Sequence, residues 1–125
     1  RIFTGLTVVE YLLADEGPGD GGVAVIPGSH KANLPCPDSM MAWEKYQEHV
    51  LELNGQAGDV VIFTETLTHG TLPWNGAHER RALLYKFSPG SLAYGSGAHA
   101  VDYPDYIGDM SEEERAVMEA PHLRR

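Results

Sequence analysis

Short apolar segments separated by dense turn signals constrain the fold of this chain more than any other feature of its sequence. The apolar segments are rich in β-branched and aromatic residues, and clusters of glycine, proline, asparagine and aspartate divide them. This pattern is typical of strands and turns. The predicted strands span residues 6–13, 23–26, 59–63, 67–72 and 80–87. Five strands with few helices predict an all-β sandwich or barrel. Several strands are apolar on both faces, which favours strands covered on both sides.

Two segments carry helical signals. Residues 40–53 show a loose helical stripe behind a capping serine or aspartate, and Asn54-Gly55 ends it. Residues 111–118 begin at Ser111, which forms a capping box with Glu114, and a proline ends this second helix. We expect a single domain over residues 1–125, with a core to about residue 90 and a tail, 91–125, that holds the short helix.

The charge balance limits the partners of the chain. Eighteen acidic residues outnumber nine lysines and arginines, which gives a net charge of −9. This balance argues against nucleic acid or an anionic membrane as a partner, so any anion site must rest on one or two arginines. No apolar run approaches the roughly 20 residues of a membrane span, and the first residues lack a signal-peptide pattern. Because Cys36 is the single cysteine, no intrachain disulfide can form, and we expect a reducing, cytoplasmic location.

His69 and Arg80 are the side chains with the clearest chemical potential. His69 follows a predicted buried strand, where a histidine can either bind a metal or be satisfied locally. Arg80 comes eleven residues later, across a turn at Asn75-Gly76. Its rigid fork of donors can bind a carboxylate bidentately. If the turn closes a hairpin, the two residues lie on neighbouring antiparallel strands. Arg81 points to the other face, and the sequence leaves open which arginine faces the core.

A set of motifs in a fixed order points to a family. The set comprises Asp20-Gly21-Gly22, Val25-Ile26-Pro27-Gly28-Ser29-His30-Lys31, Gly58-Asp59-Val60-Val61-Ile62-Phe63, His69-Gly70-Thr71 and Arg80. In order and spacing these motifs resemble the phytanoyl-CoA dioxygenase family of iron(II)- and 2-oxoglutarate-dependent oxygenases, over nearly the whole chain. The resemblance implies a double-stranded β-helix, or jelly roll, that holds iron with two histidines and one carboxylate.

The resemblance also implies roles for individual residues. His69 would be the distal iron-ligating histidine. Arg80 would pair with the C5 carboxylate of the cosubstrate 2-oxoglutarate, and Thr71 would assist the same carboxylate. Tyr11 falls near the position of an aromatic residue on a barrel strand of the family, and would be a third cosubstrate-binding residue. The implied reaction is hydroxylation of a C–H bond in a small organic substrate, with halogenation as an open alternative, and the resemblance assigns no separate catalytic residue to this chain.

The other two iron ligands of the family come from a His-x-Asp motif upstream of the strand at 6–13. No histidine of this chain has a carboxylate two residues later: His30, His49, His69, His78, His99 and His122 are followed by Ala32, Leu51, Thr71, Arg80, Val101 and Arg124. We therefore expect the C-terminal part of a jelly roll that is incomplete at its N-terminus and inactive alone. Strand edges left without neighbours further predict a homo-oligomer.

Two alternatives stay open at this point. Gly58 precedes His69 by eleven residues, the spacing of the second cupin motif, although the internal proline and glycine of that motif are absent. The absent ligands also fit a non-catalytic jelly-roll module that binds a ligand or a partner chain. Iron binding by a protein extended upstream of Arg1 would distinguish the enzyme from the module.

Overall fold

The first strand in the sequence is the central strand of the first sheet. The computed structural model describes residues 3–89, 91–92 and 103–118, and the chain divides into two compact units, Arg1–Phe87 and Ser88–Arg125. In the first unit β1 (Thr7–Leu12) lies between β4 (Val60–Thr64) and β6 (Ala82–Phe87), antiparallel to both. This pairing puts strands that are far apart in the sequence next to one another.

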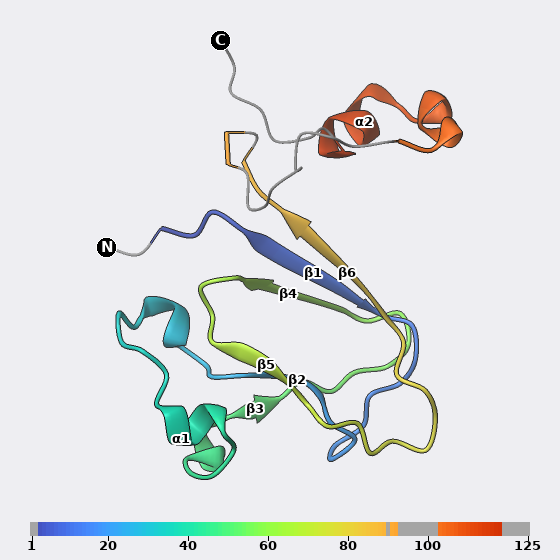
Figure 1. Cartoon of the computed structure of the whole chain (residues 1–125). Helices are drawn as coiled ribbons and strands as arrows, with labels where there is room; N and C mark the ends of the chain where they lie inside the picture. Colours follow the sequence, from blue (N-terminus) through green and yellow to red (C-terminus); the bar gives the residue numbers. More distant parts are fainter. Residues whose placement is uncertain (1–2, 90, 93–102, 119–125) are drawn as a thin grey trace. The chain divides into compact units, whose positions relative to one another are not determined.

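The second sheet faces the first within the same unit (Figure 1). Here β2 (Gly22–Val25) lies between β3 (Leu51–Glu52) and β5 (His69–Leu72), again with antiparallel neighbours. After β2 a short 3₁₀ turn, η1 (Ser29–Lys31), leads away from the sheet. Two facing antiparallel sheets that exchange strands in this way form the double-stranded β-helix that the sequence predicts. All five predicted strands are confirmed, with ends that differ by at most two residues.

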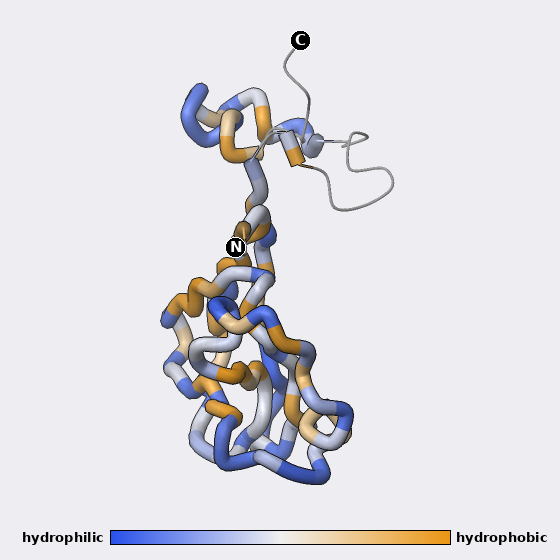
Figure 2. The backbone as a smooth tube through the Cα atoms, turned by 90° about the vertical axis from the view of Figure 1, so that its left-hand side faces the viewer, coloured by the Kyte–Doolittle hydropathy of each residue, from blue (hydrophilic) through white to orange (hydrophobic). Residues whose placement is uncertain are grey.

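The core lies between the sheets because side chains alternate along β1. Val8 and Leu12 are 0% and 3% exposed, and Phe63 of β4, which pairs with Val8, is also buried. The opposite face of this sheet is apolar too, but its large side chains are exposed: Tyr11, Val60, Ile62, Leu83, Tyr85 and Phe87. Figure 2 shows hydrophilic loops at the end of this unit that lies lowest in the view.

The helix predicted over residues 40–53 is wrong. This segment holds a short α1 (Asp38–Met41), a 3₁₀ turn η2 (Gln47–His49) and then β3. Trp43 and Tyr46 have φ angles of 60° and 65°, in the left-handed region that a right-handed helix cannot include. The loose stripe of apolar residues therefore belongs to an irregular loop that returns to pair with β2.

The second unit contains a short 3₁₀ segment η3 (Asp105–Asp109) and the helix α2 (Glu112–Met118). The predicted capping box is confirmed: the Ser111 amide donates to Glu114 Oε2 at 2.7 Å, and the Glu114 amide donates to Ser111 Oγ at 3.2 Å. These bonds lower the pKa of the Glu114 carboxyl. None of the helices in the described residues has the length and apolar character needed to cross a membrane.

Candidate functional site

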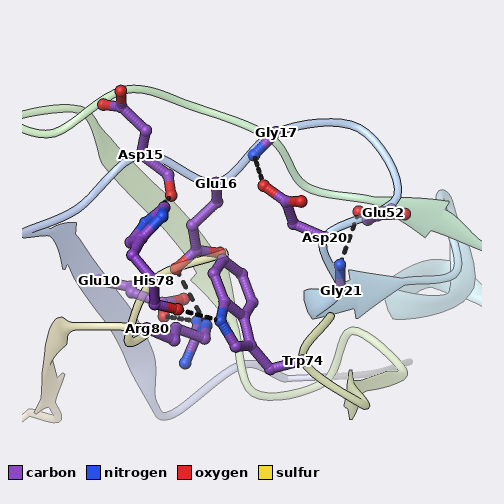
Figure 3. A network of polar contacts seen from close by, with 10 residues as sticks. All are labelled: Glu10, Asp15, Glu16, Gly17, Asp20, Gly21, Glu52, Trp74, His78 and Arg80. Carbon is purple, nitrogen blue, oxygen red and sulfur yellow. Dashed lines mark hydrogen bonds and ion pairs between the residues drawn. The ribbon is translucent and has the colours of Figure 1, made fainter. Parts of the chain in front are cut away.

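Three charged side chains meet beside the end of β1 (Figure 3). Arg80 Nη2 donates to Glu10 Oε1 at 2.6 Å. Arg80 Nε lies 2.9 Å from Glu16 Oε1, but this contact lacks the alignment of a hydrogen bond and is an ion pair only. Both glutamate side chains are 2% exposed, and Arg80 is 24% exposed. We call Glu10, Arg80 and Glu16 the arginine cluster.

The two arginines that the sequence leaves undecided face opposite ways. Arg80 points inward to the arginine cluster, whereas the side chain of Arg81 is 67% exposed and pairs with the exposed Glu79 at 2.8 Å. Alternation along the extended chain before β6 explains the difference. Arg80 is thus the arginine that contacts the interior of the unit.

The expected hairpin between His69 and Arg80 is wrong, because β5 and β6 belong to different sheets. The connection between them crosses from one sheet to the other and is tied to the loop after β1. Trp74 Nε1 donates to the His78 carbonyl at 2.6 Å, and His78 Nε2 donates to the Asp15 carbonyl at 3.0 Å. These bonds place the segment before β6 next to Glu16, which is how Arg80 reaches its partners.

Glu16 is fixed by a backbone bridge to the loop before β4. The amide of Glu16 donates to the Gly55 carbonyl, and the amide of Gly55 donates to the Glu16 carbonyl, both at 2.9 Å. Gly22, at the start of β2, leaves room for the side chain of Glu16. A Cβ atom at Gly22 would lie 2.6 Å from Glu16 Oε2 and 3.1 Å from Arg80 Nε.

We expect Gly22→Ala to destabilise the chain more than Gly19→Ala. Both glycines have positive φ angles, 92° and 85°, so an alanine introduces backbone strain of about 1 kcal/mol or more at each position. Only at Gly22 does the added Cβ also collide with the arginine cluster, whereas nothing lies within 4 Å at Gly19. The collision should add about 1–3 kcal/mol, measured as the free energy of unfolding in urea. Equal losses for the two variants would contradict the close packing at Gly22.

The arginine cluster carries more negative than positive charge when both carboxylates are ionised. Burial raises the pKa of the Glu16 carboxyl; Arg80 opposes the rise and Glu10 adds to it. Glu10 Oε2 is buried without a hydrogen-bond partner among the described residues. Among the described residues, the only hydrogen bond of the Arg80 side chain is the one from Nη2 to Glu10. The guanidinium therefore keeps N–H donors that are not used in hydrogen bonds to the described residues.

The ring of His69, at the start of β5, is held by one nitrogen. Nδ1 lies 2.8 Å from the Leu67 carbonyl oxygen, and since a carbonyl only accepts, Nδ1 carries the proton and donates. The lone pair of a neutral imidazole is then on Nε2, which lies 3.9 Å from Glu65 Oε1. A backbone carbonyl holding the second nitrogen is the usual arrangement of a metal-ligating histidine.

His69 and Arg80 contact the same face of the first sheet. The ring of His69 packs on Phe63 with centroids 5.0 Å apart, and Arg80 binds Glu10. Phe63 pairs with Val8, two residues from Glu10 along β1, so Phe63 and Glu10 share one face at a diagonal spacing of about 7–8 Å. Within the described part of the chain, no hydrogen bond or ion pair joins His69 to Arg80 directly.

The other two predicted residues differ in their placement. Thr71 lies two residues after His69 on β5 and therefore shares its face of the strand. Tyr11 follows Glu10 on β1 and points to the opposite, exposed face, where its ring packs edge-on against Tyr85 at 6.0 Å. The structure thus brings Thr71 to the side of His69 and separates Tyr11 from the arginine cluster.

A mainly apolar cavity of about 340 Å³ adjoins His69 and Thr71. One wall is formed by β2 and β5, and another by the irregular loop after η1, which contributes Cys36, Met40, Met41, Trp43 and Val50. The size suits a small organic ligand. The sequence patterns do not identify this wall, because they assign most of the loop to a regular helix.

The described residues do not form a complete metal site. No group of three or more histidine, cysteine, aspartate or glutamate side chains in residues 3–89, 91–92 and 103–118 could hold a metal ion. His99 and His122 lie outside these ranges. His69 fits as one ligand, but one imidazole does not hold iron(II) by itself.

Comparison with known proteins supports a common fold. A family model described as phytanoyl-CoA dioxygenase (PhyH) matches residues 4–82, more than half of the chain. Apo HygX from Streptomyces hygroscopicus is 25% identical with a TM-score of 0.57, over 68% of this chain and 38% of HygX. AviO1 from Streptomyces viridochromogenes Tue57 is 27% identical with a TM-score of 0.53, over 68% of this chain and 37% of AviO1. No curated protein matches the chain.

A third similar structure contains the expected cosubstrate. EctD from S. alaskensis, crystallised with 2-oxoglutarate and 5-hydroxyectoine, is 26% identical with a TM-score of 0.51, over 65% of this chain and 30% of EctD. The chain therefore spans well under half the length of each of these three proteins. The family match extends over β1 to β5 and Arg80, and so includes every residue that the sequence singles out as a site. On this match, the chain belongs to the phytanoyl-CoA dioxygenase (PhyH) family.

Proposed function

We propose that this chain forms part of an iron(II)- and 2-oxoglutarate-dependent dioxygenase that hydroxylates a C–H bond of a small organic substrate. The observation that carries the proposal is the ring of His69, with Nδ1 fixed by the Leu67 carbonyl and Nε2 left as the coordinating atom. Family membership and the 2-oxoglutarate bound to EctD support the choice of cosubstrate.

In this proposal the residues of the chain bind and orient, while bound iron and 2-oxoglutarate supply the oxidising chemistry. His69 contributes one of the three protein ligands. Arg80 binds the C5 carboxylate of 2-oxoglutarate through N–H donors of its guanidinium that are not used in the hydrogen bond to Glu10. The hydroxyl of Thr71 assists from the same face of β5 as His69. The two remaining iron ligands are proposed to come from sequence outside residues 1–125.

The apolar cavity beside His69 is the proposed substrate site. Its mainly apolar lining, which includes Met40, Trp43 and Val50, favours an apolar substrate surface. Because His69 and Thr71 also line this cavity, a bound substrate would lie next to the proposed metal ligand. Tyr11 has no role in cosubstrate binding in this proposal, and its ring packs against Tyr85.

We expect Arg80→Lys, in the protein that contains this chain, to weaken 2-oxoglutarate binding at least about tenfold. Lysine keeps the positive charge between Glu10 and Glu16 but loses the planar fork that binds a carboxylate with two hydrogen bonds. Calorimetric titration with 2-oxoglutarate measures the change. Arg81→Lys serves as the matched control and should leave the affinity unchanged, because Arg81 points outward. A loss confined to Arg81→Lys would assign the cosubstrate to the other arginine and contradict this arrangement.

A non-catalytic jelly-roll or cupin-like module that binds a ligand or a partner is the second candidate. The observation in its favour is that the described residues offer no group of three metal-binding side chains. Such a module would bind neither iron nor 2-oxoglutarate tightly in any longer form of the protein, which separates it from the dioxygenase.

A further inference from the structure

In the arginine cluster, the guanidinium of Arg80 already has carboxylate partners in the absence of a ligand. The guanidinium of Arg80 contacts two carboxylates, and both belong to side chains that are 2% exposed. With both ionised, one positive and two negative charges share a buried site. A dicarboxylate that binds to Arg80 would bring a third carboxylate to the same guanidinium, and like charges at such short range disfavour one another strongly.

The two contacts of Arg80 differ in geometry, and this difference indicates which of the two carboxylates can be neutralised at the smaller cost. Glu10 Oε1 accepts a hydrogen bond of 2.6 Å from Nη2. Glu16 Oε1 lies 2.9 Å from Nε without hydrogen-bond alignment, so this contact is electrostatic. Neutralising Glu16 would weaken an ion pair that is not aligned as a hydrogen bond, whereas neutralising Glu10 would weaken the aligned bond that orients the guanidinium.

The surroundings of Glu16 contain few other charges. Arg80, from the segment before β6, and Glu10, from β1, are the charged groups that act on it. From β2 it meets Gly22, and from the loop before β4 it meets the backbone of Gly55. The nearby carboxylates accept hydrogen bonds from backbone amides: Asp20 from Gly17 and Glu52 from Gly21 (Figure 3). Asp15 accepts from Ala57, and Glu52 also accepts from Gly19.

We infer that Glu16 takes up one proton from solvent when a carboxylate binds to Arg80. Because the protonated Glu16 is neutral, the guanidinium can pair with the carboxylate of the cosubstrate, and Glu16 acts as a positioning residue. The inference rests on the proposed function, because it takes 2-oxoglutarate as the ligand of Arg80. The neutral Glu16 keeps its place against Gly22 and its backbone bridge to Gly55, while Glu10 continues to hold the guanidinium. Burial also raises the pKa of the Glu16 carboxyl, which favours its protonated form.

Proton uptake can be measured without any turnover. The protein that contains this chain is titrated anaerobically with 2-oxoglutarate in the presence of nickel(II), at pH 7.5, in buffers with different ionisation enthalpies. We expect uptake of about one proton per 2-oxoglutarate bound. The affinity should fall about tenfold for each unit of pH between the pKa of Glu16 in the free protein and its higher pKa in the complex. Glu16→Gln should abolish the uptake and make the affinity independent of pH. Glu79→Gln, an exposed carboxylate paired with Arg81, is the control and should keep the uptake.

The outcomes separate this inference from the proposed function. Binding of 2-oxoglutarate by the wild type without proton uptake, or with the same uptake in Glu16→Gln, overturns the inference and leaves the dioxygenase proposal standing. Complete absence of 2-oxoglutarate binding overturns the dioxygenase proposal, and the inference falls with it.

Discussion

Arg80→Met is expected to lose about 3–5 kcal/mol of unfolding free energy at pH 7. Methionine keeps an apolar stem of similar length but leaves Glu10 and Glu16 buried without their cation, and a buried charge that loses its partner destabilises by this amount. Because small domains are typically stable by only about 5–15 kcal/mol, the variant should be close to unfolding at room temperature. Urea unfolding followed by circular dichroism measures the loss.

Arg81→Met provides the matched control. The side chain of Arg81 is 67% exposed and its ion pair with Glu79 is on the surface, so its removal should change the unfolding free energy by less than about 0.5 kcal/mol. Equal stability of the two variants would mean that the arginine cluster does not stabilise the fold.

The loss in Arg80→Met should also depend on pH. The pKa of Glu16 in the folded wild type is raised above its usual value of 4.5, so the folded state holds this proton more readily than the unfolded state. The contribution of Glu16 to stability is therefore largest below pH 4.5 and falls as the pH rises through its folded pKa. Without Arg80 the ionised form is still less favourable, so the difference between variant and wild type should shrink as the pH is lowered through this range.

The strands and the second helix could be predicted because their signals are local. β1 and β4 are rich in β-branched residues and are bounded by glycine, proline or aspartate, so propensity and turn chemistry agree. Ser111 and Glu114 lie within one turn of helix, and their reciprocal bonds form as the capping-box pattern predicts. Each of these elements is determined by residues a few positions apart.

The connection after β5 and the loop before β3 could not be predicted because tertiary contacts determine them. Asn75-Gly76 is a strong hairpin signal, yet the segment crosses between sheets and is held by the bond from His78 to Asp15, residues far apart in sequence. In the loop, positive φ angles at Trp43 and Tyr46 override a weak helical stripe.

The arginine cluster did leave a signal in the sequence. Glu10 has the same parity in its strand as Val8 and Leu12, and the burial of those two neighbours requires the carboxylate to face the core as well. A carboxylate in that position needs a cation, which limits its partners to the few arginines and lysines of the chain. The sequence contains no comparable signal for Glu16, which a turn-rich loop presents.

His69→Ala is expected to reduce iron(II) affinity at least about a hundredfold in a longer protein that carries sequence upstream of Arg1. Loss of a ligand should exceed the 10–100-fold effect of losing a residue that only orients a ligand. His49→Ala is the control, since the side chain of His49 is 63% exposed and contacts Glu48 and Tyr46, and it should leave the affinity unchanged. Equal losses for the two variants would show that His69 is not a ligand.

Anaerobic calorimetric titration with iron(II) and 2-oxoglutarate tests most directly whether His69 is one part of a divided iron site. The 125-residue chain should show no strong binding, because its described residues supply a single candidate ligand. The longer protein should bind one iron, with metal–nitrogen distances of about 2.0–2.2 Å, and His69→Ala should abolish that binding. Micromolar iron binding by the 125-residue chain, or a site in the longer protein that survives His69→Ala, would contradict the assignment.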